Sequence, residues 1–170
     1  MADAVMKLER KYLAHYINPA FTTSDDAVYE RLGKDLEEFS VELNPEVETV
    51  RNILGENSVQ MSGYEVTADT DPFYYATGDD FAQKVLDIAL GRLTGDQCKT
   101  TYVDVVLKPG TGGGAPTVTT AWREDVYVVP TSYGGDTTGV QVPFTVHFAG
   151  NRVQGTFDLE TRKFTPDKAL

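Results

Sequence analysis

Alternation of apolar and polar positions is the most frequent pattern along this chain. It is clearest over residues 140–148, where every second residue is a valine or a phenylalanine, as in a half-buried strand. Gly150 and Asn151 follow, and both residue types tolerate the positive φ of a tight hairpin turn. We therefore predict a hairpin over 140–160 in which one buried face carries Phe144, Phe148, Val153 and Phe157, with Phe144 opposite Phe157. Pro143 cannot donate a ladder hydrogen bond and predicts an edge or a bulge.

Similar alternation predicts further strands over 39–43, 103–107 and 118–129, and a meander or hairpin set over about 36–68 with turn signals at Asn44-Pro45 and 55–57. Residues 80–93 show apolar spacing of three and four instead, so we predict a helix there that covers a face or edge of the sheet. The glycine-rich segment 108–117 predicts a mobile loop. The expected fold is one mainly β domain, a sandwich or barrel with one flanking helix.

Charge is concentrated in one part of the chain. The 170 residues carry a net charge of −11, and segment 37–80 holds eleven acids against one base, Arg51. This net charge argues against binding to a phosphate backbone, because that affinity comes from neutralising phosphates with lysine and arginine. The acids either form an ordinary solvated face or, because they lie in strand-like sequence, a deliberately negative surface.

Candidate chemistry is sparse, and we expect neither an enzyme nor a cofactor site. His15 and His147 are the two possible bases and lie in strand-like sequence without a nucleophile motif, and Cys98 also lacks one. The acids near 69–71 and 79–80 lack the spacing of a calcium loop. The sequence therefore predicts no catalytic, cofactor or metal residues.

Two further observations bound the function. The first ten residues lack the apolar centre of a secretory signal, and no apolar run approaches the roughly 20 residues of a membrane span, so we expect no contact with a membrane. Trp122, Tyr127, Tyr74 and Tyr75 could form a sugar-stacking platform, which keeps a carbohydrate-binding or ligand-binding β-sandwich open as the alternative.

Three stretches, taken together and in order, carry a resemblance to a known family. They are Tyr-Glu-Arg-Leu-Gly-Lys-Asp-Leu-Glu-Glu-Phe-Ser-Val-Glu-Leu-Asn-Pro at 29–45, Gly-Tyr-Glu-Val-Thr-Ala-Asp-Thr-Asp-Pro-Phe at 63–73, and Val-Pro-Phe-Thr-Val-His-Phe-Ala-Gly-Asn-Arg-Val-Gln-Gly at 142–155. In these the chain resembles the major tail tube proteins of long-tailed phages and prophages of Gram-positive hosts. A tube protein of a related contractile apparatus is a nearby alternative.

The resemblance implies a structural virion protein, made in the host cytoplasm, that forms hexameric rings stacked into a tube. It implies a tape measure protein inside that tube, tail terminator and distal tail proteins at its ends, and DNA that passes through without specific binding. The acidic strands would line a negative lumen, with Glu38, Glu42, Glu46 and Glu48 as the candidate residues. By their place in the chain, a terminal arm over 1–18 and the loop residues Gly110, Thr111, Gly112, Gly113 and Gly114 would contact neighbouring subunits.

Overall fold

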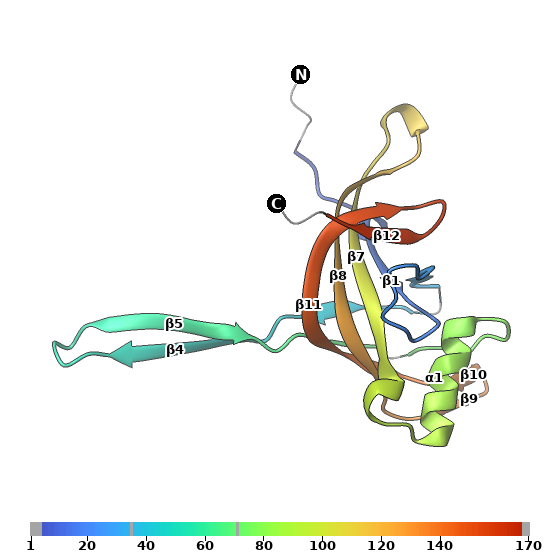
Figure 1. The fold of residues 1–170 in the computed structure, drawn as a ribbon, viewed down its shortest axis with the longest axis horizontal. Coiled ribbons are helices and arrows are strands. Elements are labelled where there is room, and N and C mark those ends of the chain that lie inside the picture. Colours follow the sequence, from blue (N-terminus) through green and yellow to red (C-terminus); the bar gives the residue numbers. More distant parts are fainter. Residues whose placement is uncertain (1–4, 35, 71, 168–170) are drawn as a thin grey trace.

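The computed structural model describes residues 5–34, 36–70 and 72–167 of one mainly β chain. Its main sheet has the strand order β2-β1-β7-β8-β11-β6-β3, with β12 paired to β11 and every pair antiparallel (Figure 1). The strands are β1 (Leu13–Ile17), β2 (Glu30–Leu32), β3 (Ser40–Glu42), β6 (Thr67–Asp69), β7 (Lys99–Lys108), β8 (Thr117–Pro130), β11 (Phe144–Asp158) and β12 (Lys163–Pro166). The mainly β fold is confirmed, and so are the strands expected over 103–107 and 118–129.

The sheet curls into a partly closed barrel because β11 is long and bent (Figure 1). One edge of β11 pairs with β8, whereas its other edge pairs first with β6 and then with β12. Where the two ends of the curl approach, the ring of Phe39, just before β3, contacts the ring of His15 in β1 at 4.7 Å between centroids.

The hairpin predicted over 140–160 is wrong. Gly150 and Asn151 do have positive φ, but they form an irregularity within β11 and not a turn, since pairing with β8 shifts register on both sides of Gly150. The turn comes later, between β11 and β12, and places Phe157 opposite Phe164. The expected strand over 140–148 is also interrupted at Pro143, and its first part is the short β10 (Gly139–Gln141), which pairs with β9 (Gly134–Asp136).

One hydrophobic core fills the inside of the curled sheet at the end where β7 begins. It includes Tyr102, Val126, Val128, Phe144 and Val146, all almost fully buried. The helix α1 (Asp80–Gly91) closes this end with Phe81, Ala82, Val85 and Ile88, which recur at helical spacing. The Asp79 side chain accepts a hydrogen bond from the Ala82 amide, and Arg92 in the left-handed conformation ends the helix, so the predicted helix is confirmed.

A second core lies on the outer face of the sheet, at the opposite end. There β12 and the segment before β2 cover Val103, Val105 and Ala121, and Phe157 packs on Tyr16 at 4.4 Å between ring centroids. Because β1 is a buried strand between β2 and β7, the terminal arm predicted over 1–18 cannot include Leu13–Ile17. Residues 1–4 of that prediction lie outside the described residues.

The hairpin of β4 (Pro45–Arg51) and β5 (Asn57–Tyr64) projects away from this body (Figure 1). These two strands form a separate two-stranded sheet, and nearly every residue in them is exposed. A hairpin in this region was expected, but its extension into solvent was not.

Candidate assembly surface

The projecting hairpin has two chemically different faces. Cross-strand partners in an antiparallel pair lie on the same face, and residues alternate between faces along each strand. Val47 pairs with Met61 and Thr49 with Val59, while Pro45 pairs with Tyr64 beyond a bulge at Ser62. These residues form what we call the apolar stripe, made of Pro45, Val47, Thr49, Val59, Met61 and Tyr64.

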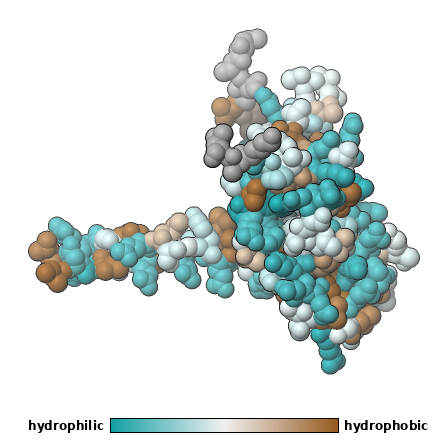
Figure 2. Space-filling model, viewed as in Figure 1, coloured by the Kyte–Doolittle hydropathy of each residue, from teal (hydrophilic) through white to brown (hydrophobic). Residues whose placement is uncertain are grey.

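The opposite face of the hairpin is polar and acidic. Glu46 and Glu48 lie on it with Gln60, Ser58 and one exposed valine, Val50, and the Ser62 hydroxyl donates a hydrogen bond of 3.0 Å to the Glu46 carboxylate. Figure 2 shows hydrophilic side chains along one side of the projection and hydrophobic surface along it and at its end. An isolated two-stranded hairpin is marginally stable in water, so an exposed apolar face of this length indicates a surface that another chain covers.

The turn between β4 and β5 displays two aliphatic side chains. The Asn52 side-chain oxygen accepts hydrogen bonds from the backbone amides of Leu54 and Glu56. The backbone amide of Asn52 donates to the backbone carbonyl of Glu56. Gly55 supplies the positive φ that the turn requires. This ordered turn leaves Ile53 fully exposed and Leu54 77% exposed. We call residues 52–56 the hairpin tip.

The base of the hairpin is fixed to the body at Asn44. This residue has φ 44°, its side-chain amide donates to the Glu65 carbonyl at 3.0 Å, and its own carbonyl accepts from the Glu65 amide at 3.3 Å. The direction in which the hairpin leaves the sheet is therefore set by paired backbone groups.

The mouth of the curled sheet, at the end where β7 finishes, forms a groove of about 790 Å³. We call it the concave groove. Its apolar lining comes from β1, β3 and the residue before it, β7, β8 and both sides of the hairpin base, and consists of Leu13, Phe39, Val41, Leu43, Tyr64, Val66, Val106 and Trp122. The apolar stripe therefore begins at the rim of this groove.

A network of polar side chains forms the floor of the concave groove. His15 Nδ1 lies 2.7 Å from Asp104 Oδ1, and His15 Nε2 lies 2.8 Å from the Arg10 guanidinium, which also donates to the Phe39 carbonyl. Because an arginine can only donate, Nε2 is the acceptor and Nδ1 carries the proton. Tyr102 donates to Asp104 at 2.5 Å, and burial, followed by the Asp104 charge, raises the pKa of Tyr102.

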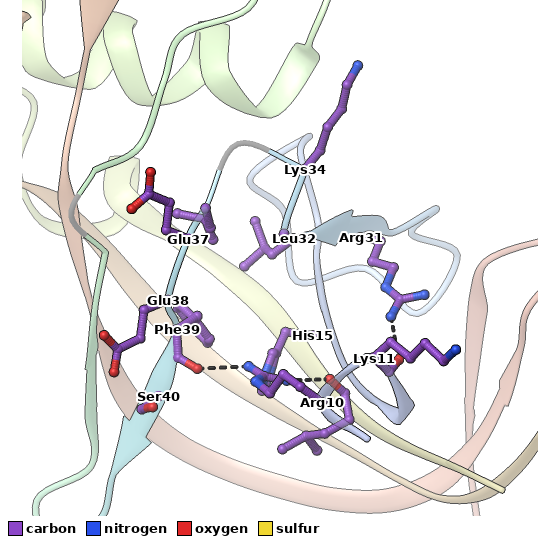
Figure 3. Close-up of a pocket in the computed structure, with 13 residues that line it drawn as sticks. Arg10, Lys11, His15, Arg31, Leu32, Lys34, Glu37, Glu38, Phe39 and Ser40 are labelled. Atoms are coloured by element: carbon purple, nitrogen blue, oxygen red, sulfur yellow. Dashed lines mark hydrogen bonds between the residues drawn. The ribbon is translucent and has the colours of Figure 1, made fainter. Parts of the chain in front are cut away.

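A polar cleft of about 670 Å³ lies beside this network, and Figure 3 shows the residues that line it. Glu37 and Glu38 point to one side, whereas Lys34, Arg31 and Lys11 lie on the other. The Arg31 guanidinium donates to the Lys11 carbonyl at 2.7 Å. This cleft and the concave groove share Arg10, Leu13, His15, Phe39 and Ser40, so they form one continuous depression.

A second apolar depression, of about 710 Å³, lies at the other end of the sheet. We call it the basal groove, lined by Ile88 and Leu93 near the end of α1, by Tyr127 and Val129 of β8, and by His147. Cys98 also lines it, its thiol donates to the Leu93 carbonyl, and burial raises the pKa of that thiol.

The structure brings together only part of the predicted acidic set. Glu46 and Glu48 share the polar face of the hairpin, as expected. Glu42 lies on β3 and is exposed, but Glu38 precedes that strand, which begins at Ser40, so the two do not share a strand face. All four carboxylates are accessible to solvent.

The predicted loop residues Gly110 to Gly114 connect β7 to β8 as a compact turn. Thr111–Gly113 form one 3-10 turn, closed by a hydrogen bond from the Gly114 amide to the Thr111 carbonyl. Gly112 and Gly113 have positive φ, which favours glycine, and a Cβ on Gly110 would lie 2.2 Å from the Gly114 carbonyl oxygen, so glycine is required at 110.

The four aromatic residues considered for sugar stacking do not share one surface. Trp122 lines the concave groove under the Arg152 guanidinium, while Tyr127 lines the basal groove. Tyr74 bridges to Gln141, and Tyr75 donates its hydroxyl to Gln83. Among the described residues no three His, Cys, Asp or Glu side chains cluster as metal ligands do. Within the same ranges, no helix has the length and apolar character needed to cross a bilayer.

Sequence comparison gives no match, either to protein-family models or to curated proteins. Comparison of folds does give matches. The chain is similar to the sheath/tube terminator of an extracellular contractile injection system (PVC), solved by cryo-EM in its extended state. The TM-score is 0.54 at 10% sequence identity, over 91% of this chain and 100% of that one. The likeness establishes a fold shared with a protein from a tube and sheath assembly, and it does not test the resemblance to the major tail proteins of phages of Gram-positive hosts.

Proposed function

We propose that this chain is a non-enzymatic structural subunit of a phage-like tail or injection tube, and that it functions by assembling with copies of itself into rings. The observation that carries the proposal is the projecting hairpin, whose apolar stripe and tip are covered by nothing in the described chain. The shared fold supports the same class of role.

The finer form of the proposal is a major tail tube protein. Six copies would form each ring, rings would stack around a tape measure protein, and terminator and distal tail proteins would close the ends. Glu38, Glu42, Glu46 and Glu48 would face the lumen and repel DNA phosphates over the 8–10 Å to which physiological salt screens charge. The turn at 110–114 would contact a neighbouring subunit, and its amides should gain hydrogen-exchange protection on assembly.

A second candidate function is that of a terminator, which ends a tube. It is supported by the fold that this chain shares with a sheath/tube terminator. Electron microscopy of the purified protein over a concentration series separates the candidates. A tube protein should give rings that stack into filaments, whereas a terminator should give single rings that bind only the ends of a tube. Particles that stay monomeric at every concentration would contradict both.

The lumen assignment has its own test. Replacing the four glutamates by lysine should leave the fold intact, because exposed charges contribute little to stability. DNA should then adhere to the tube and ejection should slow, more so at low salt. Lysine substitution of Glu9, Asp87, Asp96 and Glu160, which are exposed acids outside the hairpin and β3, gives a control with the same charge change. Equal ejection rates for both variants would contradict the assignment.

A further inference from the structure

We infer that the concave groove of one copy is the receptor for the hairpin tip of a second copy. The inference rests on the proposed self-assembly and names the two surfaces that make the contact. One is the exposed pair Ile53 and Leu54, and the other is the apolar lining around Val106 and Trp122.

The hairpin cannot fill the groove of its own chain. Seven residues of β4, at about 3.4 Å each, carry the tip about 24 Å from the hairpin base. That base, at Leu43 and Tyr64, is itself part of the groove rim. Since the hairpin leaves the body as an extended projection, its tip lies far from its own groove, and the matching tip must come from another molecule (Figure 1).

The groove is suited to being covered. Its polar side chains already satisfy one another: His15 bridges Arg10 and Asp104, and Arg152 donates to Glu124 at 3.2 Å. Among the described residues no buried side-chain nitrogen or oxygen lacks a hydrogen-bond partner. Covering these paired side chains removes apolar surface from water at a smaller cost than burying unpaired polar groups would carry.

The charges of the two surfaces also match. Between Pro45 and Tyr64 the hairpin carries three acids and one base, which are Glu46, Glu48, Glu56 and Arg51. The groove and the adjoining cleft carry five bases against four acids, on a chain whose net charge is −11. The bases are Arg10, Lys11, Arg31, Lys34 and Arg152. Glu56, the acid of the tip, thus meets a depression more basic than the chain as a whole, while Glu46 and Glu48 stay on the opposite face of the hairpin.

The concave groove is favoured over the basal groove by continuity. A tip seated in the concave groove places the incoming hairpin against the start of the receiver's own apolar stripe, because Tyr64 belongs to both surfaces. The same contact then covers groove and stripe together. The basal groove lies at the other end of the sheet and would leave the stripe bare.

Cysteine cross-linking between copies tests the inference. In a Cys98→Ser background, Leu54→Cys protein is mixed with a size-tagged Thr120→Cys protein, Thr120 being a groove residue, and treated with a short bis-maleimide. The matched control replaces Thr120→Cys by Val129→Cys, which is 40% exposed in the basal groove. We expect the mixed cross-link at 54–120 under assembling conditions and its loss on dilution.

The outcomes separate this inference from the proposed function. Rings with a 54–129 cross-link, or rings with neither mixed cross-link, would overturn the groove assignment and leave self-assembly standing. Absence of any assembly would overturn both. As a second measurement, Ile53→Asp with Leu54→Asp should raise the concentration needed for assembly at least about tenfold, since two aliphatic anchors are lost. Ser58→Asp on the polar face should have little effect, and equal effects would contradict the inference.

Discussion

Gly155, in the bent strand β11, gives the sharpest test of how the outer core is built. It lies between Ala121 of β8 and Pro166 of β12 in the register of the sheet. A Cβ at this position would lie 2.3 Å from the Thr165 carbonyl oxygen and 2.5 Å from the Phe164 ring. Both distances are far below van der Waals contact, and one neighbour is backbone, so Gly155→Ala forces β12 to move.

The expected loss of stability follows from the buried side chain that β12 contributes to the core. Overpacking in a core costs about 1–3 kcal/mol. Complete loss of a buried phenylalanine costs about 3–5 kcal/mol, and Phe164 is only 3% exposed. We therefore expect Gly155→Ala to lower the free energy of unfolding by about 3 kcal/mol, which for a chain of this length corresponds to a drop in Tm of about 6–12 °C.

Gly63→Ala is the matched control. Gly63 is also a strand glycine, and a Cβ on it would meet no atom within 4 Å. Both substitutions reduce the entropy of the unfolded chain equally, so that contribution cancels in the comparison. Urea unfolding should place Gly63→Ala within about 0.5 kcal/mol of the natural protein. A difference between the two variants below about 1 kcal/mol would refute the reasoning, because the steric overlap would then be relieved at little cost.

Three further substitutions give independent tests. Phe157→Ala should lower the free energy of unfolding by about 3–5 kcal/mol through the cavity left beside Tyr16, as urea denaturation can measure, and a loss under 1 kcal/mol would contradict this packing. Arg10→Met should cost about 1–3 kcal/mol in the same assay, because His15 Nε2 loses its donor, and a neutral result would mean that water replaces the guanidinium. Burial, followed by Asp79, raises the pKa of Glu30, so its ionisation destabilises the fold as pH rises above the unfolded value. The stability gained by Glu30→Gln should therefore be larger at pH 7 than at pH 4, and a gain independent of pH would contradict this assignment.

Local signals predicted the helix and most strands because those signals act within a few residues. Asp79 caps α1 through a contact three residues away, and the alternation over 103–107 matches a strand buried on one face. The same signals failed at Gly150 and Asn151. A glycine-asparagine pair fits a turn or a bulge equally well, and only the pairing of β11 with the long strand β8 decides between them.

The candidate surface was less predictable than the fold. Alternation at Val47, Val59 and Met61 indicates a face that is apolar, but it does not say whether the same chain covers that face. The His15 network joins side chains from positions 10, 15 and 104, so no local spacing reveals it. The sequence did offer one signal for the exposed tip. Two large aliphatic residues, Ile53 and Leu54, stand directly before Gly55, where a turn was expected.

The arrangement of the two cores connects the apolar and acidic features. One core fills the inside of the curled sheet at one end, and the other covers its outside at the opposite end. The concave groove is the part of the inner face that the first core leaves uncovered, and the basal groove is the part of the outer face that the second core leaves uncovered. If a second copy covers the concave groove and the apolar stripe, the hairpin keeps its other face in water. That face carries Glu46 and Glu48. Burial of the stripe by neighbouring copies would therefore by itself direct carboxylates toward the remaining solvent, and six such hairpins arranged around an axis would line it with negative charge.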